Sequence, residues 1–398
     1  MRLGAIGDVV RTLPSLHLIR KRFPAAWIAW AVEEKSLEIL LGNPDLDEII
    51  LAERQRWAQL LKNPFKLPEV VSEISKFLSG LRRKKFDTVV DFHSSIKSGI
   101  ISLATGAAER IGYTARYSRE FNFLFNNIRM SLRQKRVSRM ERNFTLLRHF
   151  GIEAGEMKGN KPSVMKDSMA GDEKEMIKDK IRSEIKEESR NKGKFEIQAE
   201  IVVSDEDRIY IDCFLKRENL EDNKRIIVYP GASRRQAYKK WDADNYASLA
   251  GMLVKNTEFA LILAWGPGEM DECQEIARKA KASIWFSPSL QERIRIAPET
   301  SLKQLAELIR RCHLFIGGDT GAMHISCAVR TPCVVLYGPT DPVINAPWGE
   351  HYRVVHDDAI ACSPCRKRSC RKGTCFENLT PEVVFKETQD FIKEMKCR

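Results

Sequence analysis

The chain has 398 residues, of which 43% are hydrophobic, and it carries a formal net charge of +12. This length favours two domains, and the absence of any window of roughly 18 apolar residues predicts a protein without membrane-spanning helices. The N-terminus also lacks a charged stretch followed by an apolar segment, so we expect the protein to be soluble and not exported. The positive charge predicts a surface that attracts anions, such as nucleic acid, phosphorylated lipid or a nucleotide.

Short apolar runs alternate with helical patterns along the chain, which is typical of parallel βαβ units. In the first half, these runs predict strands at 28–32, 48–51 and 86–92. In the second half, they predict strands at 225–229, 259–265, 313–316 and 333–336. The alternation therefore predicts an α/β protein made of two such halves.

The N-terminal stretch MRLGAIGDVVRTLPSL places a turn at residues 4–8 after a strand-like start that is very short. Two explanations stay open. The start of the sequence lies too far downstream, or Arg2 and Leu3 form an abbreviated strand. Read alone, Asp8 would be the N-cap of the helix that follows the turn.

The middle of the chain carries a long charged segment at 166–194, which has hardly any large apolar residues and cannot bury enough surface to fold alone. We therefore expect a first domain over 1–165, an insertion over 166–198 and a second domain over 199–380. The insertion is read as a solvated helix or disordered segment, with a partner-binding helix as the alternative. A final amphipathic helix is predicted over 381–398, with Thr380 as its N-cap.

The strongest local signal is CHLFIGGDTGAMHISCAV at 312–329, a strand followed by a turn of small residues and a helix. The small residues let a ligand approach the backbone, and the free amides of the new helix favour an anion. Asp319 is either an N-cap or a ligand-binding residue. His324 lies in the first turns of the helix, where it is either a buried core histidine or a ligand contact.

Two further turns of this kind follow predicted strands. PGASRRQAYKKW places Ser233 and Lys239 where a hydroxyl and an ammonium could bind a diphosphate, or else it forms a solvated basic loop. WGPGEMDE offers Glu269 for helix amides or ribose hydroxyls. Because the carboxyl ends of parallel strands meet at one crevice, the three turns predict a nucleotide site. None has the GxGxxG or Walker pattern, which argues against a dinucleotide oxidoreductase and a P-loop phosphotransferase.

The ten cysteines include two groups of interest. Five lie in apolar runs and are predicted to be small core residues in a reducing compartment: Cys213, Cys273, Cys312, Cys327 and Cys333. Four others share the stretch CSPCRKRSCRKGTC: Cys362, Cys365, Cys370 and Cys375. Their spacing could bind one structural zinc ion, while reduced or disulfide-linked loop cysteines are the alternative.

Several of these stretches together resemble glycosyltransferase family 9, the ADP-heptose:lipopolysaccharide heptosyltransferases. LGAIGDVVRTLP, PGAS followed by Lys-x-Trp, GPGE and FIGGDTGAMHISCAVRTPCVVLYGPTDP occur in the family's order over nearly the whole chain, the charged segment apart. The resemblance implies a GT-B architecture, in which two Rossmann-like domains face an interdomain cleft. It also implies inverting transfer of heptose from ADP-heptose to an inner-core lipopolysaccharide acceptor, with no metal needed for the chemistry.

The resemblance further implies roles for single residues. Asp8 matches the family's general base, which takes the proton of the acceptor hydroxyl. Eight residues match the donor site: Ser233, Lys239, Glu269, Thr300, Asp319, Thr320, Gly321 and His324. Five basic residues are candidates for binding the anionic acceptor: Arg54, Arg56, Lys97, Arg119 and Arg142.

We expect a monomer in peripheral contact with the cytoplasmic face of the inner membrane. The basic run at 129–142 could attract an anionic membrane surface, or it could be a merely solvated face. Two other functions stay open. One is the same fold acting on another nucleotide sugar or glycan acceptor. The other is a basic nucleic-acid-binding protein that uses the cysteine stretch as a zinc module, which leaves the three phosphate turns without a role.

Overall fold

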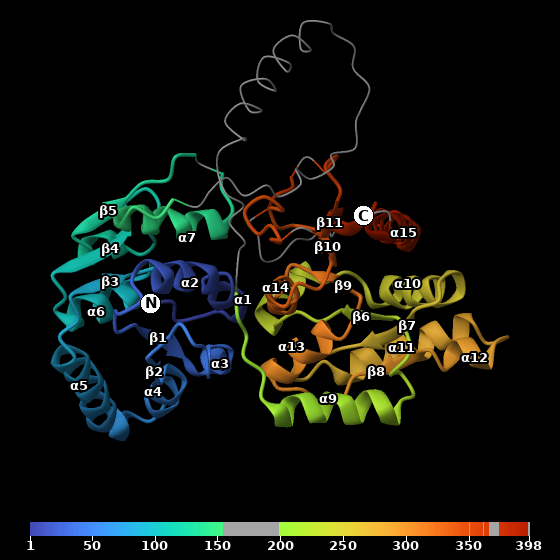
Figure 1. Cartoon of the computed structure of the whole chain (residues 1–398), viewed down its shortest axis with the longest axis horizontal. Helices are drawn as coiled ribbons and strands as arrows, with labels where there is room; N and C mark the ends of the chain where they lie inside the picture. The colour runs from blue at the N-terminus through green and yellow to red at the C-terminus, as the bar shows by residue number, and fades with distance from the viewer. Residues whose placement is uncertain (135, 154–198, 350, 361, 366–373, 397–398) are drawn as a thin grey trace, which may run out of the picture.

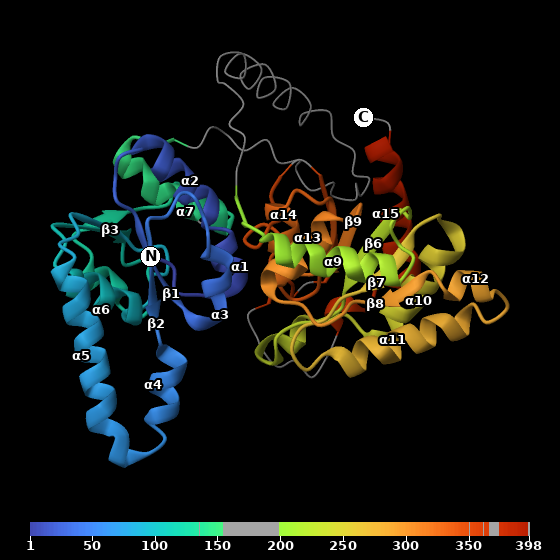
Figure 2. The ribbon, with the colours of Figure 1, turned by 60° about the horizontal axis from the view of Figure 1, so that its bottom comes forward.

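The computed structural model describes residues 1–134, 136–153, 199–349, 351–360, 362–365 and 374–396 (Figure 1). These residues form two lobes, an N-terminal one drawn in blue to green and a C-terminal one in yellow-green to red (Figure 1 and Figure 2). The charged insertion predicted over 166–198 lies outside the described residues, and so does Cys370.

The C-terminal lobe contains one six-stranded sheet in which all neighbouring strands are parallel. Its strands are β6 (Arg225–Tyr229), β7 (Ala260–Leu263), β8 (Ile294–Ile296), β9 (Leu314–Gly318), β10 (Cys333–Tyr337) and β11 (Tyr352–His356). They lie in the order β11-β10-β9-β6-β7-β8, so the strand order reverses between β6 and β9. This is the order of a doubly wound Rossmann sheet, which binds ligands where the order reverses, at the carboxyl ends of the strands.

The N-terminal lobe contains a parallel pair and a parallel group of three strands. The pair is β1 (Ala29–Glu33) with β2 (Glu48–Ala52), and the group is β3 (Thr88–Val90), β4 (Glu109–Tyr113) and β5 (Ile128–Met130). The residues Met1–Leu3 lie between the two: the Leu3 carbonyl accepts from the Glu33 amide at 2.8 Å, and the Met1 carbonyl accepts from the Phe92 amide at 3.1 Å. No strand is assigned to these three residues, but with their segment counted first the order of segments matches the strand order of the C-terminal lobe.

Helices cover the sheets in both lobes. The N-terminal lobe has α1 (Ile6–Val10), α2 (Leu13–Arg22), α3 (Glu34–Leu37), α4 (Arg54–Leu60), α5 (Leu67–Arg83), α6 (Ile96–Thr105), the 3-10 helix η3 (Asn122–Phe125) and α7 (Arg139–Leu147). The C-terminal lobe has α9 (Asp205–Arg217), the 3-10 helix η5 (Arg234–Lys239), α10 (Ala243–Asn256), α11 (Met270–Ser283), α12 (Pro288–Gln291), α13 (Leu302–Arg310), α14 (Gly321–Ala328) and α15 (Pro381–Lys396). The predicted final helix is confirmed as α15.

Polar contacts join the two lobes directly. The Glu38 carboxylate accepts from the amides of Leu302 and Lys303 at 3.1 and 3.0 Å, so a side chain of one lobe caps α13 of the other. At a second contact between the lobes, the Arg136 guanidinium donates two hydrogen bonds of 2.9 Å to the Asp341 carboxylate. Because bidentate arginine–carboxylate pairs are strong and directional, these contacts fix how the lobes meet.

Two sequence predictions need correction. Cys213 is exposed rather than part of the core, because its neighbours Ile211 and Phe214 occupy the buried face of α9; the other four predicted core cysteines are buried. The basic run at 129–142 is also not one solvated face, since Arg136 and Arg139 turn toward the C-terminal lobe. None of the described helices is long and apolar enough to cross a membrane.

Candidate active site

The loops after β6 and β9 meet where the strand order of the C-terminal sheet reverses. Lys239 ends η5, which follows β6, and its ammonium donates to the Asp319 carboxylate at 2.8 Å. Both side chains are nearly buried, with exposed fractions of 11% and 6%. The predicted convergence of these two turns is confirmed, and it brings one cation and one carboxylate to the ligand-binding edge of the sheet.

Helix α14 begins directly beside this ion pair. Its N-cap is Thr320 rather than Asp319, and the Thr320 side chain makes no capping hydrogen bond. Among the described residues, the buried Thr320 hydroxyl has no hydrogen-bond partner. The first amides of α14, starting at Gly321, therefore share a helix N-terminus with an unpaired hydroxyl, an arrangement that suits a phosphate group.

His324 is a buried residue of α14, only 2% exposed. Its ring stacks on Trp348, with centroids 5.5 Å apart, and its Nε2 lies 3.9 Å from Asp319 Oδ1. Burial, and after it the charge of Arg11, lowers the pKa of His324 well below its usual value. The imidazole is therefore neutral near pH 7 and can offer a hydrogen bond without adding charge to the site.

The pKa of His324 predicts how stability changes with pH. The unfolded chain takes up a proton at this histidine near its ordinary pKa of about 6.5, whereas the folded chain takes it up only at lower pH. As the pH falls below about 6.5, the free energy of unfolding of the wild type should therefore decrease. The decrease should be steeper than in His324→Gln, by up to about 1.4 kcal/mol per pH unit. Urea unfolding across this window measures the difference, and parallel pH profiles would contradict the neutral buried histidine.

The Glu269 side chain lies between the turn after β6 and the turn after β7 and contacts both. Its carboxylate accepts from the Gly266 amide at 3.0 Å and lies 3.5 Å from the Tyr229 hydroxyl. A Cβ atom on Gly231 would lie only 1.9 Å from Glu269 Oε2, so the PGAS and GPGE turns touch. Burial and the Glu269 charge raise the pKa of Tyr229, which keeps its hydroxyl protonated.

The remaining donor candidates lie less centrally. Ser233 is exposed at the start of η5. Thr300 is half-buried in the loop between β8 and α13, and no hydrogen bond among the described residues joins it to the Lys239–Asp319 pair. The structure therefore brings together Lys239, Asp319 and His324, while Thr300 stays a prediction.

Asp8 lies in the first turn of α1, whose N-cap is Ala5. Its carboxylate is 17% exposed and accepts hydrogen bonds from Arg2 and Arg11, while Arg139 Nη1 lies 3.5 Å away. Burial alone would raise the pKa of Asp8, but the charges of the three arginines outweigh it and hold the pKa well below its usual value. Asp8 is therefore a carboxylate surrounded by cations, and it is not an N-cap.

The turn that carries Asp8 packs against the start of α14 in the other lobe. A Cβ atom on Gly7 would lie 2.6 Å from His324 Cδ2 and 3.4 Å from the Gly321 Cα. A side chain at position 7 would require His324, which stacks on Trp348, or the backbone beside it to shift. The contact places Asp8 beside the donor candidates.

This close approach predicts that Gly7→Ala lowers the free energy of unfolding by about 1–3 kcal/mol, since the added methyl group overpacks the contact between the lobes. Gly80→Ala in α5 is the matched control: its Cβ meets nothing within 4 Å, so it should stabilise the protein by about 0.5–1 kcal/mol. Denaturant unfolding measures both. Equal stability of the two variants would contradict the packing described here.

The acceptor candidates separate into two groups. Arg142 lies over the Tyr113 ring at 4.2 Å, and Arg119 lies near enough for the charges of Arg139 and Arg142 to lower its pKa, after burial as the main cause. Lys97 is exposed on the first turn of α6. Arg54 and Arg56 instead pair with carboxylates on their own surface, as Arg56 does with Glu73 at 2.6 Å and Arg54 with Glu33 at 3.0 Å. The structure does not bring these two to Asp8.

The arginines around Asp8 were missed by the sequence reasoning. Arg11 is the C-cap residue of α1, three residues after Asp8, and Arg2 stands in the segment before the helix, so their spacing was a usable signal. Arg139 comes from α7, and its Nε donates to the Asn345 side chain at 3.0 Å. Only the fold brings this residue to both Asp8 and the C-terminal lobe.

The cysteine stretch is described in part. Cys362 is exposed, Cys365 half-buried and Cys375 buried. Within the described ranges, no group of three or more histidine, cysteine, aspartate or glutamate side chains could hold a metal ion. Because Cys370 lies outside these ranges, the zinc site stays a prediction.

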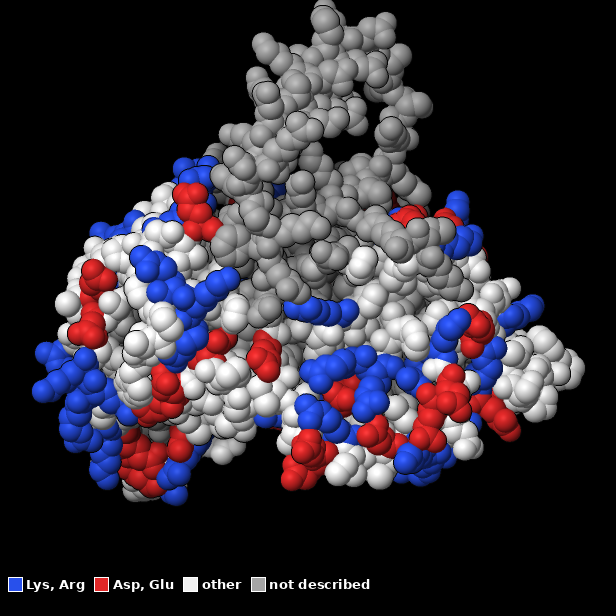
Figure 3. All heavy atoms as spheres, viewed as in Figure 1, with Lys and Arg blue, Asp and Glu red and all other residues white. Residues whose placement is uncertain are grey.

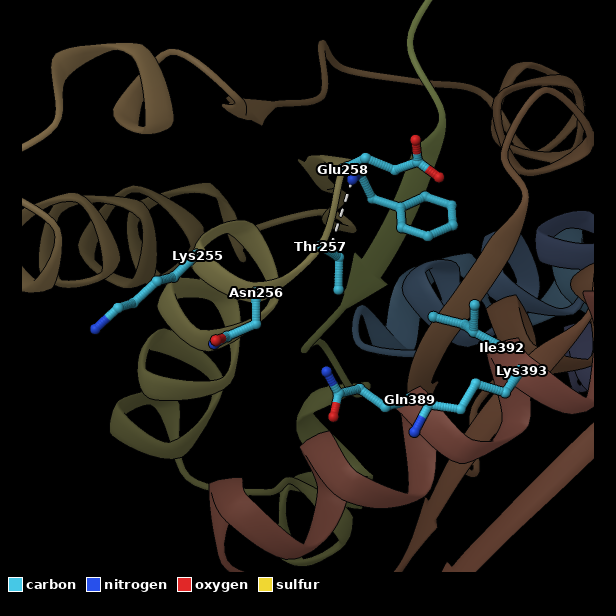
Figure 4. A pocket seen from close by; sticks show the side chains of 8 residues that line it. Lys255, Asn256, Thr257, Glu258, Gln389, Ile392 and Lys393 are labelled. Atoms are coloured by element: carbon cyan, nitrogen blue, oxygen red, sulfur yellow. Dashed lines mark hydrogen bonds between the residues drawn. The ribbon is translucent and has the colours of Figure 1, made fainter.

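A pocket elsewhere on the C-terminal lobe does not belong to this site. Figure 4 shows Lys255 and Asn256 of α10 on one side, and Gln389 and Lys393 of α15 on another. The pocket also includes Thr257, which precedes β7, so it lies at the amino end of that strand. Parallel sheets bind ligands at the opposite edge.

Comparisons with known proteins agree with this geometry. Residues 74–375 match the model of glycosyltransferase family 9 (heptosyltransferase). The chain is similar to lipooligosaccharide heptosyltransferase 2 of Campylobacter jejuni, with 32% identity over 44% of this chain and 53% of that protein. It is also similar to lipopolysaccharide core heptosyltransferase OpsX of Haemophilus influenzae, with 24% identity over 89% and 82% of the two chains. The alignments thus span about half the length of the first of these relatives and most of the second.

A solved structure shows the same fold. Escherichia coli heptosyltransferase WaaC with ADP-2-deoxy-2-fluoro heptose superposes with a TM-score of 0.66 at 19% identity, covering 99% of this chain and 98% of that one. The predicted GT-B architecture is therefore confirmed. Since the family model covers most of the chain and the motifs predicted from sequence meet at one site, the chain belongs to glycosyltransferase family 9.

Proposed function

We propose that this chain transfers heptose from ADP-heptose to an inner-core lipopolysaccharide acceptor with inversion at the anomeric carbon. The observation that carries the proposal is the meeting of Asp8 with the Lys239, Asp319 and His324 group across the two lobes. In this proposal, residues 199–380 bind the donor and residues 1–165 the acceptor. The names of the relatives, which are lipopolysaccharide or lipooligosaccharide heptosyltransferases, support the choice of heptose and of a lipopolysaccharide acceptor.

In the proposed reaction, the acceptor oxygen attacks the anomeric carbon while Asp8 takes the hydroxyl proton. The bond from that carbon to the β-phosphate oxygen breaks, its electron pair stays on the phosphate, and ADP leaves. Lys239, the Thr320 hydroxyl and the first α14 amides stabilise the new negative charge, so the chemistry needs no metal ion. Transfer should therefore persist in EDTA.

The arginines around Asp8 have a role in this proposal. While they pair with it, the carboxylate is a weak base, because they hold its pKa well below the usual value. Carboxylate or phosphate groups of an anionic acceptor would compete for Arg2, Arg11 and Arg139 and so raise the basicity of Asp8. Arg119, Arg142 and Lys97 are proposed to extend the same acceptor surface.

Titration calorimetry with ADP-heptose, ADP and other nucleotide sugars tests the donor. We expect ADP-heptose to bind and a truncated core acceptor to gain one heptosyl residue; binding of a different nucleotide sugar alone would favour another transferase of the same fold. The nucleic-acid alternative has less support, since on the face shown in Figure 3 the basic side chains are interspersed with acidic ones on both lobes.

We further propose that the protein acts as a monomer at the cytoplasmic face of the inner membrane and that the cysteine stretch holds a structural zinc ion. Metal analysis of the purified protein tests the second point. About one zinc per chain is expected, with the metal lost in Cys365→Ser. Absence of zinc from protein purified without chelators would contradict it.

A further inference from the structure

Helix α6 reverses the usual arrangement of an amphipathic helix. Its buried face carries small residues, Ser98, Gly99, Ser102 and Thr105. Its exposed face carries Ile96, Ile100 and Leu103, whose spacing of three and four residues puts them on one side. A helix that buries serines and exposes isoleucines and leucine is typical of an element with an apolar partner outside the lobe.

The adjoining helix η3 continues this apolar surface. It exposes Leu124, and Phe121 just before it is 71% exposed. The elements touch, because a Cβ atom on Gly99 would lie 2.4 Å from the Phe125 ring. We define the α6–η3 patch as the five exposed side chains Ile96, Ile100, Leu103, Phe121 and Leu124.

The backbone at this patch is strained in a way that exposes its aromatic residue. Phe121 has a φ angle of +56° and Glu120 one of +51°, both in the left-handed region that side chains with a Cβ disfavour. Such conformations persist where surrounding contacts impose them, and they concentrate at functional sites. Here the strained turn directs a phenylalanine into solvent instead of into the core.

Charges around the patch indicate an anionic partner. Lys97 is exposed on α6, and Arg116 and Arg119 are exposed on the loop that leads from β4 into η3. The nearby acid, Glu120, accepts a hydrogen bond from the Ile96 amide at 3.2 Å and so caps α6. An apolar centre with cations at its edge is the composition of surfaces that bind anionic bilayers, where the apolar side chains enter the headgroup region.

We propose that the α6–η3 patch docks the enzyme on an anionic lipid bilayer. This inference rests on the proposed function, because docking there would present a lipid-linked acceptor to the site. Arg119 stands two residues before Phe121 and lies near Arg139, which contacts Asp8. The patch is thus continuous with the cationic surface around the candidate base.

Flotation of the full chain with vesicles of phosphatidylethanolamine and phosphatidylglycerol tests the proposal. Ile100→Ser combined with Phe121→Asn should lower the vesicle-bound fraction by about tenfold, because two apolar side chains no longer enter the bilayer. Asparagine also suits the left-handed backbone at this position. The matched control, Trp285→Ser with Phe286→Ser, removes two exposed aromatic side chains of the C-terminal lobe and should bind vesicles like the wild type.

Three results would overturn the inference: no flotation of the wild type, equal loss in both double variants, or loss only in Phe65→Ser, which alters an exposed side chain between α4 and α5. Analytical ultracentrifugation tests whether the patch binds a second copy of the chain instead. If the wild type is a dimer and the Ile100→Ser, Phe121→Asn variant is a monomer, the patch is a dimer interface and the bilayer proposal is wrong. Transfer to an acyl-free acceptor should be unchanged in this variant. If the wild type lacks that activity while vesicle binding follows the prediction, the proposed function fails and the docking surface stands.

Discussion

Asp8→Asn should lower kcat by about 10²–10⁴-fold, the usual contribution of a positioned general base, while ADP-heptose binding stays close to that of the wild type. Asparagine keeps the shape of the side chain but cannot take the proton of the acceptor hydroxyl. Donor binding should persist because the Lys239–Asp319 pair belongs to the other lobe. Steady-state kinetics and titration calorimetry on the same preparations separate the two effects.

The arginines around Asp8 add a second expectation for this variant. Without the carboxylate, Arg2 and Arg11 lose this anionic partner and become available to an anionic acceptor, so the acceptor KM should not rise even though kcat falls. The control is Asp47→Asn, which removes a carboxylate that pairs with Arg20 on the surface of the same lobe. The control should turn over at a rate within about twofold of the wild type, since surface ion pairs contribute little. Normal turnover in Asp8→Asn would remove it as the base.

Lys239→Met should have the second large effect. The substitution removes the one described cation that contacts Asp319 at hydrogen-bond distance, and loss of one such charge at a transition-state oxyanion typically costs about 10²–10³-fold in kcat. It should also destabilise the fold by about 3–5 kcal/mol, because Asp319 is left buried without its partner. Both ADP affinity and the free energy of unfolding are to be measured.

A double variant distinguishes these two consequences. Lys239→Met with Asp319→Asn removes both charges, so stability should recover substantially while ADP affinity stays low. Lys240→Met is the matched control: this neighbouring lysine pairs with Glu272 at the half-exposed surface of α11 and should matter little to either measurement. Recovery of ADP affinity together with stability would show that Lys239 is structural and does not contact the diphosphate.

Strands were predictable where apolar β-branched residues run without interruption. The predicted strand at 225–229 coincides with β6, and 333–336 falls one residue short of β10. β4 was missed because its sequence, ERIGY, mixes charged residues and glycine, and because Gly112 is needed where Asn126 approaches within 2.2 Å of a Cβ position. β8 was missed since Ile-Arg-Ile is too short to show a period.

The site was predictable as far as each residue belonged to a turn at a strand end. Asp319 and Lys239 could be paired in advance, since parallel strands bring such turns together. Arg139 could not, because it stands 131 residues after Asp8 and its approach depends on how α7 packs beside α1 within the N-terminal lobe. The prediction that Cys213 is a core residue was wrong because a helix rotates about 100° per residue. A small apolar residue next to the buried Ile211 and Phe214 can therefore still lie on the exposed face of the helix.

The central claim is that the site formed by both lobes transfers heptose from ADP-heptose. The most direct measurement incubates the full chain with ADP-heptose and a Kdo-lipid A acceptor, and follows ADP release, product mass and the configuration of the new linkage by NMR. We expect stoichiometric ADP release, a gain of one heptosyl residue and inverted configuration, with the rate of transfer lowered by about 10²–10⁴-fold in Asp8→Asn. Transfer with retained configuration, or no binding of any ADP ligand by the folded protein, would contradict the account.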